Sequence, residues 1–362
     1  SRIECLLKDY RILSIALTGA LARGEGIWKI SSHVKILSDL DLVIITRRTV
    51  KNISDYLKLI GRDIHKGINL DLKIMSLHGL RKTPKYFLTH FWDYKYRSIT
   101  LVGEDVERYL PPVKVEELSF LDIADLFFNR VLLTIKNLSP YELESDYKNT
   151  LQKISYIASK IMCTCTDIIT ILLHNYQSSF LKKSEITVRN LRKMSDLPID
   201  KERFLEDLEK AILFVIDPTL QCIPDAKEYL LRVMDYLLRL FEYSIGKYFG
   251  TSNILDYLKF EHRKLPLSNR LISSYHLFKA RRIPKIPFLW RTNPIAYYRI
   301  ATLMCYLALR SPHYMNEFLN ESERYLSKIF FPISNYNIRK RNQRWTLLRN
   351  ELVWLNKHAQ LF

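Results

Sequence analysis

The stretch ILSIALTGALARGE occupies residues 12–25, and the stretch DLDLVIIT occupies residues 39–46. In the first, a short apolar run ends at Thr18-Gly19 and a segment with helical character follows. In the second, two carboxylates precede a run of β-branched residues. Such an alternation between strand-like and helix-like patterns predicts an α/β unit.

Around these stretches the sequence predicts a small sheet. Strands are expected at residues 12–17, 42–45, 69–75 and 98–102. Between the second and third strands, residues 52–66 have apolar side chains at helical spacing and stop before Gly67, a residue typical of a helix C-terminus. We therefore expect residues 1–110 to form an α/β domain.

After Pro111-Pro112 the pattern becomes helical. Ser119, followed by Asp122, is expected to cap a helix that runs to Leu138, because a hydroxyl accepts from free N–H groups and a carboxylate favours the helix N-terminus. Further helices are expected at residues 143–175, 201–216, 224–249, 252–262, 294–311, 313–330 and 336–358. Residues 111–362 are therefore expected to form an all-α domain, with a further boundary suggested near residue 262.

The charge of the chain is strongly uneven. The 362 residues include 56 Lys and Arg against 38 Asp and Glu, which gives a net charge of +18. Residues 1–110 carry 19 basic and 12 acidic residues, residues 111–260 carry 19 and 21, and residues 261–362 carry 18 and 5. The balances are therefore +7, −2 and +13, so most of the excess is C-terminal. Nucleic acid, polyphosphates and acidic surfaces are the candidate partners of such a chain.

Cysteine usage and hydropathy predict a reduced, cytoplasmic protein. The five cysteines include no Cys-x-x-Cys pair, and no His cluster accompanies them at metal-ligand spacing. Residues 295–309 come closest to a membrane span, but they contain Arg299 and fall short of the ~20 residues that span a bilayer. We therefore expect no membrane span.

Carboxylates at the strands carry the strongest chemical signal. In extended backbone, residues i and i+2 point to the same side, so Asp39 and Asp41 present their carboxylates together. Two like charges so close repel each other unless a cation lies between them. Asp71 belongs to the next strand-like run, and a neighbouring strand lies only ~5 Å away. The pattern favours a Mg²⁺ site, because this ion prefers a few carboxylates with waters and substrate phosphates. Solvated residues at a strand end are the alternative interpretation.

The turn at Gly19 supplies a place for phosphate. It follows a strand and opens a predicted helix, which would aim backbone N–H groups and a positive dipole end at an anion. A triphosphate held between this turn and two Mg²⁺ ions would present its α-phosphorus to a hydroxyl, with both the entering and the leaving oxygen stabilised.

With these residues, the chain resembles the nucleotidyltransferase superfamily of the DNA polymerase beta type, which includes aminoglycoside nucleotidyltransferases, CCA-adding enzymes, poly(A) polymerases and small transferases paired with toxins. The family signature is an apolar strand, Gly-Ser, a spacer, Asp-x-Asp or Asp-x-Glu, and a third Asp on a later strand. Gly19, Asp39, Asp41 and Asp71 look like these positions. The resemblance covers about residues 10–105 and implies an α/β nucleotidyltransferase core with a small mixed sheet, followed by a large all-α domain.

The chain departs from the family pattern in two places. Ala20 stands where the family has Ser, so a hydroxyl that would bind phosphate is absent, and the loss of such a contact costs ~1–3 kcal/mol. Arg23 is the residue we expect to compensate. The spacing from Gly19 to Asp39 is also longer than the family norm, so residues 24–37 are expected to form an inserted hairpin.

The resemblance implies Mg²⁺-dependent transfer of a nucleoside monophosphate from an NTP to an acceptor hydroxyl, with release of pyrophosphate. Asp39 and Asp41 would bind two Mg²⁺ ions, and Asp71 would bind the ion nearer the acceptor and take its proton. The residues expected to hold phosphate are Gly19, Ala20, Arg23 and Lys73. Two alternatives stay open: a catalytically impaired domain that binds nucleotide or nucleic acid, which Ala20 favours, and a protein-modifying or toxin-controlling transferase.

Several other polar residues are weaker candidates. Lys73 shares a strand face with Asp71, so a structural ion pair is an alternative to a role at the site. Asp167, His174 and Tyr176 lie near one helix end and either face the site or simply end the helix. The residues interpreted as ordinary surface or core positions are Arg47, Arg48, His78, His90, Cys163 and Cys165.

Two basic segments near the C-terminus interleave cations with aromatic residues. They occupy residues 279–291 and 339–345. Such segments follow a phosphate backbone and stack bases in some proteins and form a solvated face in many others. Residues 261–362 are therefore the place where we expect a nucleic acid or another anionic acceptor.

Overall fold

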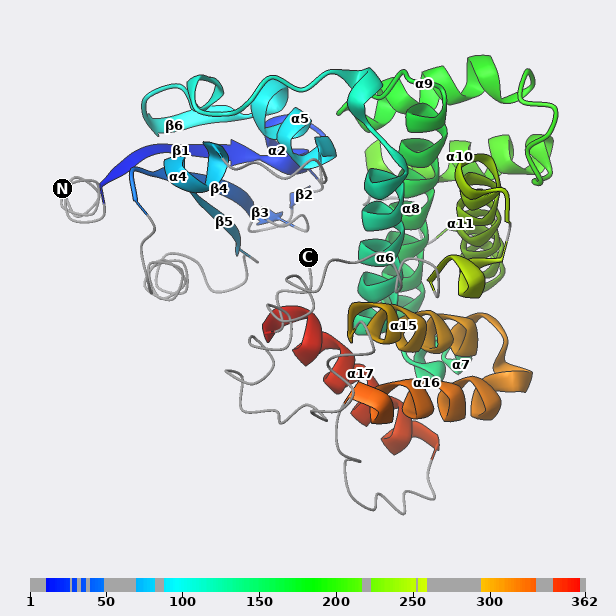
Figure 1. Cartoon of the computed structure of the whole chain (residues 1–362). Helices are drawn as coiled ribbons and strands as arrows, with labels where there is room; N and C mark the ends of the chain where they lie inside the picture. The colour runs from blue at the N-terminus through cyan, green and yellow to red at the C-terminus, as the bar shows by residue number, and fades with distance from the viewer. Residues whose placement is uncertain are drawn as a thin grey trace. The chain divides into compact units, whose positions relative to one another are not determined.

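The structure is a computed structural model of the whole chain (Figure 1), and it describes residues 11–26, 28–30, 34–36, 40–48, 70–81, 88–216, 223–251, 253–258, 294–329 and 341–358. Within these residues a small sheet comes first and helices follow, as the sequence predicts. The predicted helix over residues 52–66 and the suggested boundary near residue 262 lie outside them.

Four strands form a mixed sheet, and all four were expected. They are β1 (Ile12–Thr18), β4 (Leu40–Thr46), β5 (Leu70–Ser76) and β6 (Ile99–Gly103). Their order across the sheet is β5-β4-β1-β6. Strand β1 is antiparallel to both β4 and β6, whereas β4 and β5 are parallel. The β-branched and leucine-rich runs suit the two inner strands, β1 and β4, because such side chains pack well on a pleated surface.

The segment between β1 and β4 holds a single helical turn and a hairpin. Helix α2 (Gly19–Ala22) has four residues and follows β1 directly. Strands β2 (Trp28–Ile30) and β3 (Val34–Ile36) pair antiparallel as a separate two-stranded sheet. The hairpin expected within residues 24–37 is therefore confirmed.

One face of the sheet is covered by elements that the sequence did not predict. These are α4 (Leu77–Arg81), α5 (Leu88–Arg97) and the 3-10 turn η1 (Val106–Arg108). Together with the sheet they bury a cluster that includes Ala16, Val43, Ile45, Leu80, Val106 and Leu110. Helix α5 will matter below because it carries Asp93.

Helices follow from residue 120. They are α6 (Phe120–Asn137), α7 (Pro140–Glu144), α8 (Lys148–Leu172), α9 (Phe180–Leu191), α10 (Lys201–Ile216), α11 (Ala226–Phe249), α15 (Pro294–Arg310), α16 (Met315–Ile329) and α17 (Arg341–His358), with short 3-10 turns at η2 (Val115–Glu117) and η3 (Pro312–Tyr314). The helix expected at 201–216 coincides with α10. The sequence did not predict α9, and it treated α7 and α8 as one helix.

The break between α7 and α8 has a local cause. Ser139 and Glu142 form a reciprocal capping box at the start of α7, in which each side chain accepts from the other residue's backbone. Ser145 then leaves the helix with an extended backbone, and α8 begins three residues later at Lys148. A continuous helix over 143–175 was therefore wrong at its N-terminal end.

The contacts between Cα atoms divide the chain into two compact units. Unit 1 comprises Ser1–Asp122, Thr166–Met194 and Leu208–Gln221, and unit 2 comprises Ile123–Cys165, Ser195–Asp207 and Cys222–Phe362. The end of α8 and all of α9 thus belong with the sheet, although their sequence has the character of the helical region. A domain boundary at residue 110 stays a prediction.

The core of unit 2 combines stacked aromatic rings with a buried ion pair. The rings of Phe127 on α6 and Phe241 on α11 stack with their centroids 3.9 Å apart. Asp207 on α10 is fully buried and pairs with Arg232 on α11, with Nε–Oδ2 and Nη2–Oδ1 distances of 2.9 and 3.0 Å. Tyr236 on α11 donates to the same carboxylate at 3.2 Å.

Helix α8 is the one described helix that is long and apolar enough to cross a membrane by length and composition. In the structure, 83% of its most apolar window is buried inside the protein, as expected for a core helix. The idea that residues 295–309 are the most membrane-like stretch was therefore wrong, while the described helices give no clear membrane span.

Candidate functional site

Asp41 and Asp71 occupy paired positions on neighbouring strands. Strands β4 and β5 run parallel, and their register pairs Asp41 with Asp71. Paired positions on adjacent strands lie ~5 Å apart, and their side chains point to the same face of the sheet. Asp71 is exposed and Asp41 is half-buried, so neither carboxylate is directed into the core.

The Gly19 turn, defined here as Thr18–Ala22, lies against Asp41. Thr18 is paired with Asp41 across β1 and β4, and its hydroxyl donates to the Asp41 carbonyl oxygen at 3.3 Å. A Cβ atom on Gly19 would overlap Oδ2 of Asp41, and the φ of Gly19 is +68°. Only glycine fits here, because it adopts positive φ without strain and has no side chain to displace the Asp41 carboxylate that packs against it.

The third carboxylate of the predicted metal site cannot be placed. Asp39 directly precedes β4 and lies outside the described residues. Within the described part of the chain, no three His, Cys, Asp or Glu side chains gather closely enough to hold a metal ion. The structure thus brings together the Gly19 turn and two of the three predicted carboxylates.

The helix after Gly19 is shorter than the sequence suggested. Helix α2 ends at Ala22, and no side chain caps its N-terminus. The macrodipole comes from many aligned peptide units, so a single turn offers little beyond its own few N–H groups. Ala20 adds no side-chain donor. Any phosphate at this turn would therefore depend on backbone donors and on cations from elsewhere.

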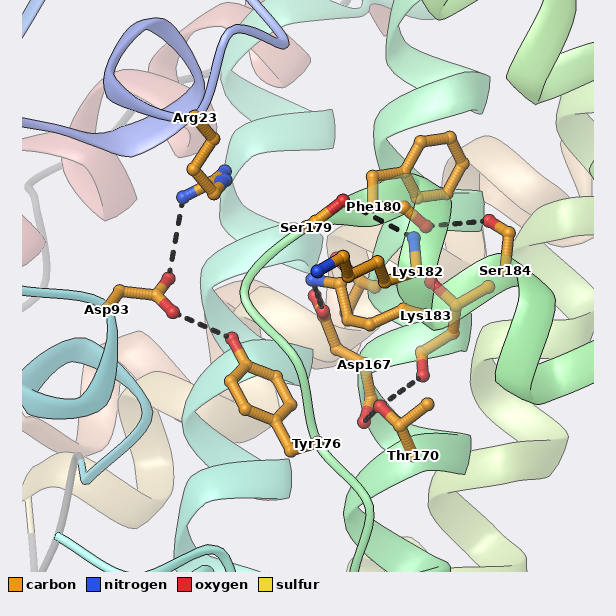
Figure 2. Close-up of polar contacts among 12 residues, drawn as sticks. Arg23, Asp93, Asp167, Thr170, Tyr176, Ser179, Phe180, Lys182, Lys183 and Ser184 are labelled. Carbon is orange, nitrogen blue, oxygen red and sulfur yellow. Dashed lines mark hydrogen bonds and ion pairs between the residues drawn. The ribbon is translucent and has the colours of Figure 1, made fainter. Parts of the chain in front are cut away.

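Arg23, expected to compensate for Ala20, is engaged by two carboxylates. Its Nε lies 3.2 Å from Oε2 of Glu25, and its Nη1 lies 3.7 Å from Oδ2 of Asp93 on α5. Its side chain is only 16% exposed. Figure 2 shows the Arg23 side chain directed toward Asp93. A role for Arg23 in phosphate binding stays a prediction, and it would compete with these ion pairs.

Glu25 joins this region to the N-terminus of α9. Its Oε1 accepts from the Ser179 hydroxyl at 2.6 Å and from the Leu181 backbone N–H at 3.4 Å. Burial alone would raise the pKa of Glu25, but the hydrogen bonds from Ser179 and the backbone of α9, together with the charge of Arg23, lower it below 4.5. Glu25 is therefore an anion at neutral pH.

A second group of polar contacts continues from Asp93 (Figure 2). The Tyr176 hydroxyl donates to Asp93 in a long hydrogen bond of 3.5 Å. The Lys183 ammonium pairs with the buried Asp167 and lies 5.2 Å from the centre of the Tyr176 ring. Burial, and then the charges of Asp93 and Asp167, raise the pKa of Tyr176 well above its ordinary value, so the phenol stays protonated.

The sequence named some members of this network and missed others. Asp167 and Tyr176 were singled out near a helix end, and both take part. Asp93, Ser179 and Lys183 were missed because α5 and α9 were not predicted. One signal was available, since Ser179 is the N-cap of α9 and its hydroxyl accepts from the Lys182 backbone.

His174 belongs to the helix end and not to the network. It adopts a left-handed backbone with a φ of +51° just after α8. The N–H of His174 bonds to Ile171, and the next N–H, from Asn175, reaches back to Thr170. Such backward bonds satisfy the last carbonyls of a helix. The helix-end interpretation holds for His174.

Cys163 and Cys165 lie on α8, half-buried and buried, as expected for packing residues, whereas the other candidates lie on the surface of unit 1. Lys73 is exposed on β5, two residues beyond Asp71, and among the described residues no ion pair joins the two. A role for Lys73 in phosphate binding stays a prediction. The side chains of Arg47, Arg48, His78 and His90 are exposed.

Part of the basic C-terminal region is structural. Arg344 on α17 pairs with Glu323 on α16, with an Nε–Oε1 distance of 2.5 Å, and Trp345 is 1% exposed. A buried ring cannot stack on a base. Base stacking by Trp345 is therefore excluded, while a nucleic-acid contact through the other residues of 339–345 stays a prediction. Residues 279–291 lie outside the described part of the chain.

No protein-family model matches this chain, and no curated protein matches its sequence. Any function assigned to the chain therefore rests on its own residues. The most informative of these are Asp41, Asp71 and Gly19, which lie at one end of the neighbouring strands β1, β4 and β5.

Proposed function

We propose that this chain is a Mg²⁺-dependent nucleotidyltransferase that moves a nucleoside monophosphate from an NTP to an acceptor hydroxyl and releases pyrophosphate. One observation carries the proposal: the parallel register that pairs Asp41 with Asp71, beside a glycine with no room for a side chain. This geometry supports three of the four positions that the sequence motif singles out, since Asp39 lies outside the described residues.

The paired carboxylates fit a divalent cation. Two charges ~5 Å apart repel each other by about 3 kcal/mol at an effective dielectric constant of about 20. A bound cation removes this repulsion, and carboxylate oxygens are the ligands that Mg²⁺ prefers. Asp41 and Asp71, together with Asp39, would hold the metal, which when bound supplies charge stabilisation at the transferring phosphate.

The protein groups have separate tasks in this proposal. The missing side chain at Gly19 keeps the backbone of the turn against the Asp41 carboxylate, so a phosphate held by that backbone would lie beside a metal ligand. Asp71 is exposed, so an acceptor hydroxyl can reach its carboxylate, which would take the proton of that hydroxyl. The acceptor oxygen then forms a bond to the α-phosphorus of the NTP as the bond to pyrophosphate breaks.

The test is transfer of label from α-labelled NTPs with Mg²⁺, using cell RNA, cell protein and small metabolites as separate acceptor fractions. We expect label in one fraction, and its loss in Asp41→Asn and Asp71→Asn, which preserve side-chain size. Glu116→Gln is a matched control, because it removes one exposed carboxylate of unit 1 away from the sheet edge. Label transfer that survives both Asn variants would disprove the metal-site assignment, and label in the protein fraction would identify a protein-modifying transferase.

A second candidate function is a nucleotide-binding module without transfer activity. Its basis is that Ala20 lacks a hydroxyl and that Arg23 is already paired with Glu25 and Asp93. Both features reduce the number of groups that could hold a triphosphate. Saturable binding of Mg²⁺-NTP in the absence of label transfer to any fraction would favour this second function.

A further inference from the structure

The first residue of the Gly19 turn, Thr18, is fixed by its pairing with Asp41, but the helix that follows it has no fully buried side chain. Helix α2 buries none of its four residues and lacks a side-chain cap. A one-turn helix is too short to be stable by itself, because nucleation fixes several residues for a single hydrogen bond. Thr18 holds the start of the turn, and contacts outside α2 must therefore hold residues 20–22 in the position that they take after Gly19.

Backbone hydrogen bonds join the turn to residues 23–25, named here the 23–25 arm. The N–H of Glu25 donates to the Ala20 carbonyl at 2.9 Å, and the N–H of Gly24 donates to Leu21 at 3.2 Å. Because of these bonds, residues 19–25 form one local unit. An anchor on Glu25 consequently fixes the residue next to Gly19.

Glu25 provides such an anchor because its two oxygens have different partners. Oε1 accepts from the Ser179 hydroxyl at 2.6 Å, and Oε2 accepts from Arg23 at 3.2 Å. The side chain of Glu25 is only 11% exposed, so water competes weakly for these bonds. Hydrogen bonds to a charged carboxylate are stronger than those between neutral groups.

Arg23 adds a weaker, second connection. Its Nη1 lies 3.7 Å from Oδ2 of Asp93 on α5, a looser contact than either bond of Glu25. Asp93 is in turn held by Tyr176. Removal of the Glu25 carboxylate would therefore leave the arm with the longer contact from Arg23 to Asp93. Removal of the Asp93 carboxylate would leave the shorter bonds of Glu25 to Ser179 and Arg23.

We propose that Glu25 is a positioning residue that ties the Gly19 turn to the N-terminus of α9, and so sets how closely the turn lies against Asp41. This inference rests on the proposed function only for its consequence, which is tighter binding of the NTP phosphates. The physical claim about the position of the turn is independent of any activity.

The first experiment measures amide hydrogen exchange in the full chain. In Glu25→Gln, we expect exchange over residues 19–26 to rise about tenfold, since a charge-assisted bond contributes about one power of ten in equilibrium. Exchange over residues 201–216 should stay as in the wild type. Glu185→Gln is the matched control. It removes a carboxylate of α9 itself, and among the described residues Glu185 forms an ion pair only with the exposed Arg189. Unchanged exchange over residues 19–26 in Glu25→Gln overturns the proposal.

A second variant keeps the test decisive if Glu25→Gln does not fold. Ser179→Ala removes the other side of the same hydrogen bond and leaves Glu25 in place. We expect it to raise exchange over residues 19–26 as well, whereas Ser184→Ala, which loses a hydroxyl within α9, should not. Equal effects of Ser179→Ala and Ser184→Ala on residues 19–26 would show that only the stability of α9 was changed, and would overturn the proposal.

Nucleotide binding separates positioning from general support. In Glu25→Gln we expect KM for the NTP to rise about tenfold with little change in kcat. In a Gly19→Ala background, the same change should have no further effect on NTP affinity if Glu25 acts through the turn. An independent, additive loss would contradict the positioning role. If the wild type neither binds nor transfers nucleotide, the proposed function fails, while hydrogen exchange still decides the role of Glu25.

Discussion

At the scale of single residues, Gly19 and Gly24 share a backbone conformation and differ in their surroundings. Their φ angles are +68° and +72°. A Cβ on Gly19 would overlap the Asp41 carboxylate, whereas a Cβ on Gly24 would meet nothing within 4 Å. The two glycines therefore offer a comparison in which backbone strain is common to both and only the contact with Asp41 differs.

From this comparison we predict that Gly19→Ala and Gly24→Ala each lose about 1 kcal/mol of unfolding free energy through left-handed strain. Gly19→Ala should lose more, because Asp41 must also move, and it alone should impair binding of Mg²⁺-NTP. Urea unfolding and nucleotide titration of both variants measure these effects. Equal nucleotide affinities in the two variants would rule out a role for the close contact between Gly19 and the Asp41 carboxylate.

The lowered pKa of Glu25 makes a second residue-scale prediction. A carboxylate whose pKa is lower in the folded state stabilises the fold above its unfolded pKa, and this stabilisation is lost as the pH falls through the folded pKa. Glu25→Gln should therefore be less stable than the wild type at pH 7, and the difference should shrink below about pH 4.5. Thermal unfolding of both proteins from pH 7 to pH 3 measures it. A constant difference over this range would contradict the assigned contacts.

At the scale of elements, helices α5 and α9 decide what surrounds the Gly19 turn. Helix α5 begins where the buried Asp122 accepts from the Thr89 backbone at 3.1 Å, and the same carboxylate accepts from Ser119 at 3.0 Å. Helix α9 begins at its N-cap Ser179. One of these starts is set by a residue 33 positions away in sequence, which explains why apolar spacing alone did not reveal α5.

Helices α10 and α11 are joined by the buried pair of Asp207 and Arg232, from which an element-scale prediction follows. Arg232→Met leaves the fully buried Asp207 without its cation, which should cost about 3–5 kcal/mol. Arg239→Met, which breaks the exposed pair with Asp235, should cost less than about 1 kcal/mol. Urea unfolding of both variants is the measurement. Similar losses would mean that burial does not set the strength of these pairs.

At the scale of the whole molecule, the charge of +18 is unevenly distributed along the chain. Some C-terminal cations are paired in the structure, as Arg344 is with Glu323 and Arg310 is with Asp235. Such cations hold helices together and contribute little to a partner's recognition. The cations between residues 261 and 293, together with Arg339 and Lys340, are among the remaining candidates for an anionic acceptor.

We therefore predict that Arg344→Gln lowers the stability of the chain without changing its affinity for a polyanion such as duplex DNA. Lys279→Gln with Arg281→Gln should weaken DNA binding and reduce its dependence on salt, because fewer counterions are released. Thermal unfolding and DNA titrations at two salt concentrations separate the two effects. The assignment of DNA binding to residues 261–293 would be contradicted by two results together. These are weaker DNA binding in Arg344→Gln and an unchanged salt dependence in the Lys279→Gln, Arg281→Gln variant.

By itself the sequence determined the four strands, the glycine turn and most of the long helices, because apolar periodicity and turn residues act over a few neighbouring positions. It also placed Asp41 and Asp71 on adjoining strands. Only the tertiary structure decided that Asp41 and Asp71 occupy directly paired positions of the two strands. It also decided that Glu25 accepts a hydrogen bond from Ser179, 154 residues away in sequence. Such partners depend on how separate elements pack, and no local pattern encodes that distance.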